Sequence, residues 1–363
     1  MSVDPVGAIA FAEKVLALLD QGAFSTSYKY AVLLGLMDLS LEGYTAAGAA
    51  PESVTTRQLA EAVTRLYWRQ VAPFAGGAGA LRQSQGTTRQ AEIVTLVERA
   101  RLGLGGGGVS LERARRAEPD AHERLLREIE WKLIEMPLPR LQTFGRQEDR
   151  FIYEIGWDAS IRRRELRSGQ FNNAILLRPG VGDHLVRLDG LLRPLLQRGW
   201  ASQVAAINRL EEARLEDHLF GTDRIALRPV RAGLLAFQGH RCFYCERRLR
   251  DEEAGEVDHF LPWSRIPLDT IENLVVADDA CNGQKRHFLA AEHHLRRWRE
   301  RMAGAADELA RLADTVRWES GGARTLGVAR ALYLPLRPDA RLWSAGSTFE
   351  LAQPGALREA LAP

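Results

Sequence analysis

Two cysteines in a C-x-x-C spacing begin the part of the sequence whose residue types could do chemistry. Cys242 and Cys245 form this knuckle, and Cys281 is the third and last cysteine of the chain. The spacing lets two thiolates bind one tetrahedral ion, and Cys281 can add a third sulfur. Asp278 stands three residues before Cys281 and repeats the knuckle spacing with a carboxylate. The four side chains predict a structural Zn²⁺ site.

Two alternative roles for the cysteines stay open. A dithiol redox site, as in a thiol oxidoreductase, would also use Cys242 and Cys245, although the βαβ context of such sites is missing around them. Three buried cysteines without a metal are the second alternative. Zinc is favoured because a short, loop-rich module has too few apolar residues to hold itself together otherwise.

A second group of polar residues lies between the second and third cysteines and directly after the third. Asp258 and His259 stand at the end of a predicted strand, Asn273 opens a further apolar run, and Asn282 stands at a predicted helix start. A single histidine is more often structural than catalytic, but this one has companions. A neutral imidazole can take a proton from water near pH 7, and carboxylate and amide oxygens suit a hard metal ion. The group therefore has the residue types that metal-assisted hydrolysis needs.

The order and intervals of these residues resemble the HNH endonucleases over residues 240–294. The resemblance rests on the strings DH, NLV and CN-x-x-K, which follow one another as they do in that family. It implies a ββα-metal finger, in which two antiparallel strands are followed by a helix. In that finger, His259 corresponds to the general base and Asp258 to a ligand of the catalytic metal.

The resemblance also assigns roles to the two asparagines. Asn273 corresponds to the middle asparagine, which braces the loop between the strands and helps to orient the base, so it joins His259 in the catalytic set. Asn282 occupies the third motif position and would be the second ligand of the catalytic metal. Oxygen ligands suit Mg²⁺ or Mn²⁺ far better than Zn²⁺. The expected cofactors are therefore a catalytic Mg²⁺ (or Mn²⁺) and a structural Zn²⁺.

Three basic residues near the motif are expected to contact the DNA backbone. Lys285 fits the basic position of the motif, and Arg265 and Arg286 lie close to it in the sequence. His287 is a different case. Some family members place a further ligand four residues after the third motif position, whereas His287 lies five residues after Asn282. The extra residue rotates it by about 100° away from the ligand face of a helix.

These roles predict a metal-dependent DNA endonuclease that hydrolyses phosphodiester bonds. The alternative is a non-catalytic, zinc-finger-like nucleic-acid-binding protein. Asp278 supports that alternative best, because a cysteine is commoner at its position in the family. Retention of DNA without any cut product would distinguish the second possibility from the first.

The composition of the whole chain agrees with a globular protein. Its 363 residues include 49 lysines and arginines against 47 aspartates and glutamates, so a nucleic-acid site must come from local patterning. Hydrophobic residues make up 45% and charged residues 26%, an ordinary globular balance. The longest apolar stretch, residues 31–37, is too short to span a bilayer, and the N-terminus has an acid and no basic run. We therefore expect a cytoplasmic protein with no membrane partner.

The elements that surround the motif are mainly helical. One apolar stripe marks the first predicted helix and consists of Ile9, Ala12, Leu16 and Leu19. Thr55 and Gln58 have the spacing of a capping box, which predicts the start of another helix. Strand signals appear around residues 151–155 and 174–177.

Two further patterns outside the motif favour surface structure over a binding site. Residues 103–108 read GLGGGG and satisfy the dinucleotide fingerprint G-x-G-x-x-G, but a charged helical run precedes them where that fingerprint needs a strand. We interpret them as a loop. Residues 162–164 are arginines, with Arg167 close by, and we interpret this cluster as a solvated face.

Together the patterns predict an α+β, predominantly helical fold. It consists of a helical region over residues 1–120, a mixed α/β region over 121–234, an HNH nuclease domain over 235–295 and a C-terminal extension over 296–363. We expect this extension to be largely helical and to pack beside the finger, with His293 and His294 solvated. Nucleases with large appended domains occur in restriction and anti-phage systems, so other subunits of such a defence system are further expected partners.

Overall fold

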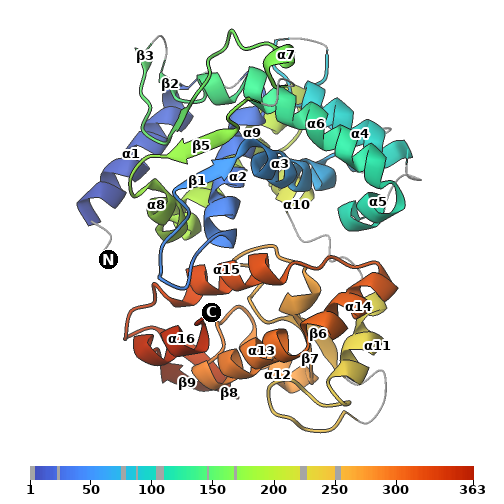
Figure 1. The fold of residues 1–363 in the computed structure, drawn as a ribbon. Coiled ribbons are helices and arrows are strands. Elements are labelled where there is room, and N and C mark those ends of the chain that lie inside the picture. The colour runs from blue at the N-terminus through green and yellow to red at the C-terminus, as the bar shows by residue number, and fades with distance from the viewer. Residues whose placement is uncertain are drawn as a thin grey trace. The chain divides into compact units, whose positions relative to one another are not determined.

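The protein consists of two compact units, of which the first comprises Met1–Leu41 and Ala50–Asp223 and the second Glu42–Ala49 and Arg224–Pro363. Helices dominate both units and the strands form small antiparallel sheets (Figure 1), so the predicted fold class is confirmed. The structure is a computed structural model that describes residues 5–22, 25–74, 79–86, 89–103, 110–144, 147–166, 170–220, 227–249 and 255–363. Most of the glycine run 103–108 and Arg167 of the arginine cluster lie outside these ranges.

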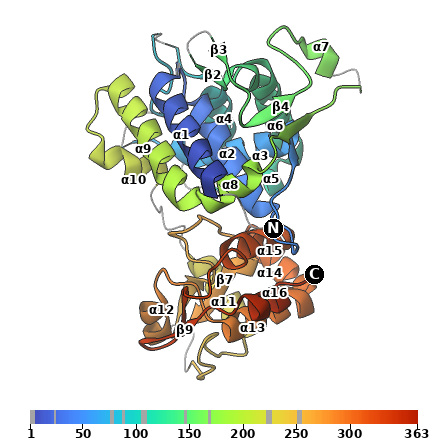
Figure 2. The ribbon, with the colours of Figure 1, turned by 90° about the vertical axis from the view of Figure 1, so that its left-hand side faces the viewer.

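The first unit is a helical assembly with a small sheet. Its helices and 3-10 turn are α1 (Pro5–Gln21), α2 (Tyr28–Glu42), α3 (Thr56–Gln70), α4 (Glu92–Gly103), α5 (Leu111–Ala117), α6 (Pro119–Glu135), η1 (Leu138–Arg140), α7 (Arg163–Leu166), α8 (Val181–Arg187), α9 (Asp189–Asn208) and α10 (Ala213–Phe220). Its strands are β1 (Ser53–Thr55), β2 (Thr143–Phe144), β3 (Gln147–Glu148), β4 (Tyr153–Ile155) and β5 (Ala174–Leu177). Helix α3 packs against α4 and α6 (Figures 1 and 2).

Several local signals of the first unit are confirmed. Thr55 caps α3, and its side chain and that of Gln58 form the reciprocal hydrogen bonds of a capping box. The strand signal at residues 174–177 corresponds to β5, which pairs antiparallel with β1 on one side and β4 on the other. These features depend on neighbouring residues, which is why the sequence could predict them.

The apolar stripe predicted for α1 is wrong for Ile9 and Leu16. These side chains are 62% and 44% exposed, whereas Phe11, Val15 and Leu18 are buried. Helix α1 is apolar on more than one side, so periodicity alone could not identify its buried face. Packing against α8 and β2 decides which side is covered.

The second unit contains the finger and the C-terminal extension. Its helices and 3-10 turn are α11 (Arg228–Phe237), η2 (Ile271–Asn273), α12 (Asp279–Lys285), α13 (Glu292–Gly304), α14 (Ala306–Val316), α15 (Gly322–Tyr333) and α16 (Pro354–Ala360). Its strands are β6 (Glu256–His259), β7 (Leu274–Ala277), β8 (Arg341–Ala345) and β9 (Thr348–Leu351), which pair as two antiparallel hairpins. The order β6, β7, α12 is the predicted ββα arrangement.

The extension completes the hydrophobic core of the finger. Phe260 follows β6 and stacks on Trp298 of α13, with ring centroids 4.9 Å apart and an interplanar angle of 8°. Trp343 of β8 is buried and its backbone hydrogen-bonds with Leu289 and Ala291. The finger therefore shares its core with residues that follow it, since these tryptophans remove large apolar areas from water.

His294 differs from the prediction that it is solvated. It is 3% exposed, and its ring lies 5.2 Å from that of Tyr244 and 5.6 Å from that of Trp343. Burial lowers the pKa of His294 to about 4, although a 2.7 Å hydrogen bond to the carbonyl of Ser344 acts in the opposite direction. Its neighbour His293 is 46% exposed.

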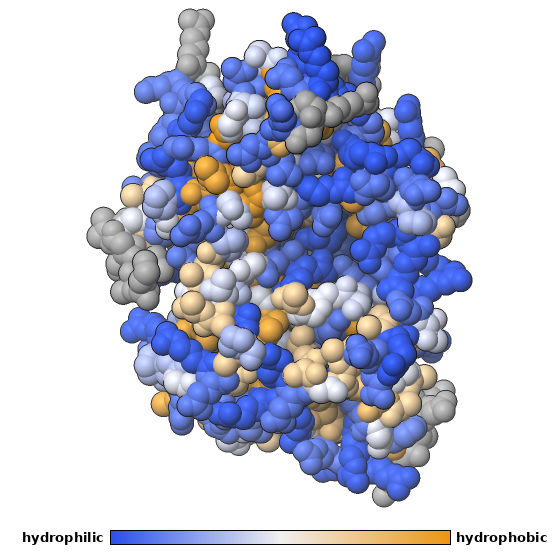
Figure 3. Space-filling model, in the orientation of Figure 1, coloured by the Kyte–Doolittle hydropathy of each residue, from blue (hydrophilic) through white to orange (hydrophobic). Residues whose placement is uncertain are grey.

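One face of the molecule can be described by the hydropathy of its residues. Hydrophilic residues cover most of the face drawn in Figure 3, as expected for a chain with 26% charged residues. Among the residues that the structure describes, no helix has both the length and the apolar character needed to cross a membrane.

Candidate functional site

The hairpin β6–β7 and helix α12 position the predicted site residues. Asp258 lies opposite Val275 and His259 opposite Leu274 in the antiparallel register. Strand β7 is buried along its whole length, which fixes the hairpin in the unit. Gly255 directly precedes β6 and has a φ of +97°, and a Cβ there would lie 2.9 Å from the carbonyl oxygen of Ala277. Glycine is therefore required where the chain enters the strand.

Asn273 lies in the loop region between the strands and is fully buried. Its Oδ1 accepts from the backbone N–H of Leu261 at 2.8 Å, and its Nδ2 donates to the carbonyls of Leu261 and Leu268 at 3.2 and 2.9 Å. Both donors and the acceptor of the amide are used by the backbone of the loop. Asn273 therefore acts on the site through the position of this loop.

His259 pairs with a carboxylate that no sequence motif indicates. Its Nε2 lies 2.9 Å from Oδ1 of Asp269, and its ring centroid lies 5.1 Å from that of Trp263. The side chains of His259 and Asp269 are 15% and 8% exposed. Asp269 follows a proline and a leucine without any motif spacing to His259, so the sequence contained no local signal for the pair.

Asp258 is held by two donors from outside its strand. Its Oδ2 accepts from the hydroxyl of Tyr244 at 2.6 Å and lies 2.9 Å from Nζ of Lys285. No described residue hydrogen-bonds to its Oδ1. Burial holds the pKa of Tyr244 well above its ordinary value, and the charge of Asp258 raises it further, so the phenol stays protonated and donates.

Lys285 lies inside the finger, which differs from its predicted place on the DNA-facing surface. Its side chain is 0% exposed, and its Nζ also donates to the carbonyl of His259 at 2.8 Å. A buried ammonium that pairs with Asp258 cannot reach a phosphate in this conformation. Its charge instead compensates a carboxylate, and its hydrogen bond fixes the end of β6. We call Asp258, His259, Asp269 and Lys285 the acid–base cluster.

Asn282 of α12 is joined to β6 through Glu256. Its Nδ2 donates to Oε2 of Glu256, and its Oδ1 has no hydrogen-bond partner in the described part of the chain. Glu256 and Asp258 are two residues apart on a strand and point to the same face of the hairpin. The structure thus places Asn282 against the strand of Asp258 and His259, with α12 packed on β6. Alternation along the predicted strand was a signal that could have found Glu256.

The two predicted arginines stay at the surface. Arg265 is exposed and its Nε donates to the carbonyl of His287, at 3.4 Å. Arg286 is exposed after the end of α12, has a φ of +49°, and donates from Nε to the carbonyl of Gly283. His287 is exposed as well. The two arginines are therefore open to solvent, in contrast to Lys285.

The structure brings together the four predicted zinc ligands. The ligand atoms of Cys242, Cys245, Asp278 and Cys281, which we call the sulfur cluster, all lie within 4.8 Å of one another. A tetrahedral ion with bonds of about 2.3 Å to sulfur requires ligand atoms roughly 4 Å apart. The donor set and its spacing therefore fit zinc, and the residues could bind such a metal.

Asp278 has two tasks in the sulfur cluster. Its Oδ1 caps α12 by accepting from the N–H of Cys281 at 2.8 Å, and its Oδ2 lies 2.9 Å from Sγ of Cys245. Burial alone would raise the pKa of Asp278, but the hydrogen bonds from Cys245 and Cys281 outweigh it and lower the pKa to about 2. Burial raises the pKa of Cys242 to about 11 and that of Cys281 further.

Comparison with known proteins identifies the finger. Residues 242–291 match a family model described as HNH endonuclease. No curated protein and no solved structure matches the chain. The matched span begins at the first cysteine of the sulfur cluster and contains both clusters. The predicted recognition of an HNH endonuclease segment is therefore confirmed for these residues, and the segments on either side lie outside the match.

Proposed function

We propose that the protein is a metal-dependent DNA endonuclease that hydrolyses phosphodiester bonds through its HNH finger. The observation that carries the proposal is the position of His259 at the end of β6, partly exposed and held by a carboxylate, next to Asp258 on a strand whose residue Glu256 binds Asn282. A nuclease that uses water needs a base in such a place, beside oxygen donors that can hold a metal ion.

His259 is the proposed general base. Histidine is the side chain best suited to accept a proton from water near neutral pH. The loop braced by Asn273 follows His259, and the Lys285 ammonium binds the carbonyl of His259 itself. The ring therefore starts from a backbone that is fixed on two sides, which keeps the base in one place.

Asp258 and Asn282 are the proposed ligands of the catalytic metal. Each has an Oδ1 atom that no described residue uses, and hard oxygen donors favour Mg²⁺ or Mn²⁺. When bound, the ion would stabilise the charge that develops on the phosphate. Lys285 and Tyr244 hold the other carboxylate oxygen of Asp258, Oδ2, and so leave Oδ1 for the ion.

The sulfur cluster is proposed to bind a structural Zn²⁺. Three thiols and the Asp278 carboxylate suit zinc, whereas the acid–base cluster offers only oxygen and nitrogen. Because Cys281 and Asp278 belong to the start of α12, zinc there would fix the helix that carries Asn282.

DNA is the proposed substrate, with backbone contacts from the exposed Arg265 and Arg286. Lys285 no longer belongs to this set, because it is buried. We assign the first unit the task of reading DNA or binding another subunit, as in a restriction or anti-phage system in the cytoplasm.

A cleavage assay on supercoiled, linear and single-stranded DNA with and without Mg²⁺ tests the proposal. His259→Ala should lower the cleavage rate by about 10²- to 10⁴-fold, the usual contribution of a general base. Its zinc content should equal that of the parent.

His293→Ala is the matched control, because His293 is exposed and lies outside the proposed site. If His259→Ala cuts as fast as the parent, the assigned base is wrong. If the parent retains DNA but yields no product with any metal, the protein is a binding module instead.

A further inference from the structure

The contact between His259 and Asp269 defines which nitrogen of the imidazole is the base. We propose that Asp269 is a positioning residue that fixes the Nε2–H tautomer of His259, which leaves Nδ1 to take the proton from water. The proposal rests on the nuclease function and deepens it. It also assigns a role to Asp269, which has no place among the motif residues.

The donor and acceptor inventory leads to this tautomer. A carboxylate only accepts hydrogen bonds, and a neutral imidazole has one N–H and one lone pair. At a separation of 2.9 Å, Nε2 of His259 must therefore donate to Oδ1 of Asp269. The lone pair is then on Nδ1, which has no hydrogen-bond partner among the described residues. Since both side chains are largely buried, water does not easily replace this contact.

The position of Asp269 is set by residues of the C-terminal extension. The indole N–H of Trp318 donates to the carbonyl of Asp269 at 2.6 Å, and the hydroxyls of Thr270 and Thr325 lie 2.6 Å apart. The next backbone N–H, that of Ile271, donates to the carbonyl of Glu319 at 2.8 Å. Three successive residues of the loop are thus held by the segment 318–325.

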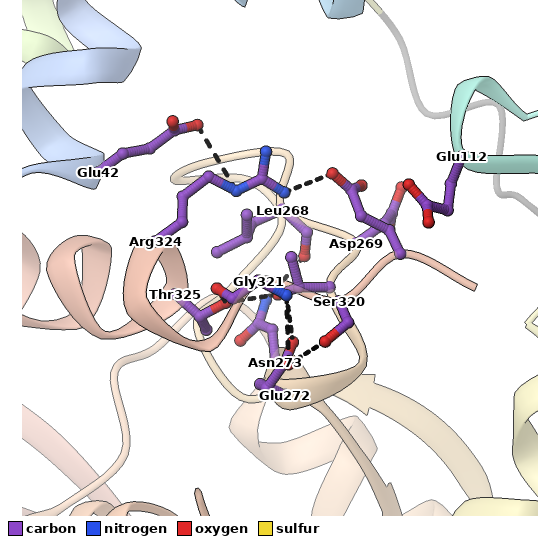
Figure 4. A network of polar contacts seen from close by, with 12 residues as sticks. Glu42, Glu112, Leu268, Asp269, Glu272, Asn273, Ser320, Gly321, Arg324 and Thr325 are labelled. Carbon is purple, nitrogen blue, oxygen red and sulfur yellow. Dashed lines mark hydrogen bonds and ion pairs between the residues drawn. The ribbon is translucent and has the colours of Figure 1, made fainter. Parts of the chain in front are cut away.

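The same segment anchors the loop one residue further on. The Glu272 carboxylate accepts from the hydroxyl of Ser320 at 2.6 Å and from the N–H of Gly321 at 3.0 Å (Figure 4). Glu272 is 7% exposed, so these bonds are shielded from water. All of the anchoring residues lie beyond residue 291, where the family match ends. The extension therefore supplies a support for the base that the motif itself does not contain.

The proton path follows from the assigned tautomer. Nδ1 of His259 takes a proton from water while the water oxygen forms a bond to phosphorus. The bond between phosphorus and the leaving oxygen breaks, and that oxygen takes a proton from solvent. The imidazolium then carries N–H groups at Nδ1 and Nε2, and the Asp269 carboxylate compensates its charge through the existing hydrogen bond.

Nitrogen NMR on the full-length, histidine-labelled protein tests the tautomer directly. We expect a protonated, pyrrole-type Nε2 and an unprotonated Nδ1 for His259, assigned by the loss of its signals in His259→Gln. In Asp269→Asn the preference for Nε2–H should weaken or disappear, because an amide can donate as well as accept. A parent protein with the proton on Nδ1 would overturn the proposal, and this measurement requires no cleavage.

Steady-state cleavage separates positioning from general damage to the fold. Asp269→Asn should lower kcat by about tenfold or more with little change in KM, because DNA binding does not use Asp269. Asp339→Asn is the matched control, since Asp339 is 76% exposed and far from the loop in sequence. Trp318→Phe, which keeps an aromatic side chain but removes the indole N–H that donates to the carbonyl of Asp269, should give a smaller loss of kcat than Asp269→Asn.

The outcomes for the tautomer and for the nuclease function are distinguishable. An unchanged kcat and an unchanged His259 spectrum in folded Asp269→Asn would contradict the positioning role, whatever the parent cleaves. A parent without cleavage but with the expected tautomer would contradict the nuclease function alone. If Asp269→Asn does not fold, the parent spectrum and Trp318→Phe still decide the question.

Discussion

The sulfur cluster and the acid–base cluster lie in the same finger but are built in opposite ways. The four groups of the sulfur cluster face one another, and the side-chain contacts of Asp278 are with cysteines of the same set. The groups of the acid–base cluster instead have partners within the protein: the Lys285 ammonium pairs with the Asp258 carboxylate, and Nε2 of His259 hydrogen-bonds with Asp269.

The difference concerns what each cluster needs from a metal. Thiols and a carboxylate that converge hold one another poorly unless a metal ion joins them. A set of ion pairs and hydrogen bonds holds its side chains in place before a metal arrives, which is what a reactive site requires. We therefore expect loss of metal to unfold the sulfur cluster. The geometry of the acid–base cluster should depend on its protein partners instead.

Removing zinc should have the largest effect on stability. Structural zinc contributes about 10–16 kcal/mol in isolated finger peptides, and the shared core with Trp298 and Trp343 should reduce the loss here to several kcal/mol. A strong chelator should lower the unfolding transition of the second unit, as followed by tryptophan fluorescence beside zinc quantitation. Cys281→Ser should reproduce the effect.

Zinc binding should also release protons. Burial keeps the pKa of Cys242 at about 11 and raises that of Cys281 still further, so both thiols are protonated at pH 7 without metal. Each must lose its proton to become a ligand. Calorimetry in buffers of different ionisation enthalpy should report about two protons or more per zinc. A chelator that changes neither stability nor proton uptake would show that the cysteines do not bind metal.

Breaking the buried ion pair of the acid–base cluster should have the next largest effect. Lys285→Met leaves the Asp258 carboxylate without its cation and should cost about 3–5 kcal/mol, as expected when one partner of a buried pair is removed. Zinc content should be unchanged, because the Lys285 ammonium binds Asp258 and the carbonyl of His259, neither of which belongs to the sulfur cluster. Chemical denaturation of both proteins measures the difference.

Lys14→Met is the matched control for this substitution. Lys14 pairs with Asp149 at 2.7 Å, but the two side chains are 50% and 43% exposed. Exposed ion pairs contribute only about 0–1 kcal/mol. Equal losses in Lys14→Met and Lys285→Met would mean that the pair at Asp258 is not desolvated, and the contrast between the two clusters would no longer hold.

The sequence was sufficient where neighbouring residues determine the structure. The capping box at Thr55 and strand β5 are set by spacing within short segments, and the ββα order followed from the family resemblance. Within each pair of the sulfur cluster the two ligands are three residues apart on a turn or a helix start, whereas the meeting of the two pairs depends on the tertiary fold. The spacings are local geometries, and the residue types themselves carry the information.

Contacts between distant segments could not be predicted in the same way. The sequence placed Lys285 at the surface because it follows the motif on a helix, yet its ammonium reaches Asp258 of β6. The support of Asp269 by Trp318 and the burial of His294 depend on how the extension folds back on the finger. Such contacts require the tertiary arrangement, since no periodicity links segments so far apart.

Acid should weaken the core that lies beside both clusters. The pKa of His294 is lowered by burial from its ordinary value of 6.5 to about 4, so the folded state binds fewer protons than the unfolded state between these pH values. The stability that depends on neutral His294 is therefore fully present above about pH 6.5 and is lost as the pH falls toward 4. The contribution should reach up to about 2 kcal/mol at pH 5.

His294→Gln should reduce this dependence on pH. Denaturation of parent and variant at pH 7 and pH 5 measures it, and His293→Gln is the control because its side chain is 46% exposed. The control should retain the slope of the parent. If His294→Gln retains it as well, other groups must be responsible for the weakening in acid.

Tyr244→Phe should have the smallest effect and tests whether the two clusters are coupled. Tyr244 lies between Cys242 and Cys245 in sequence, and its hydroxyl donates to Asp258 at 2.6 Å, so it joins the sulfur cluster to the acid–base cluster. Loss of a hydrogen bond to a charged group should cost about 1.5 kcal/mol. Zinc content should be unchanged while kcat falls, since Asp258 loses one of its two anchors.

Tyr333→Phe is the control. It loses a hydrogen bond to the carbonyl of Ala290 and should lower stability by about 1 kcal/mol without changing kcat. A lower zinc affinity in Tyr244→Phe would instead mean that the two clusters depend on each other structurally. They would then differ only in their chemistry.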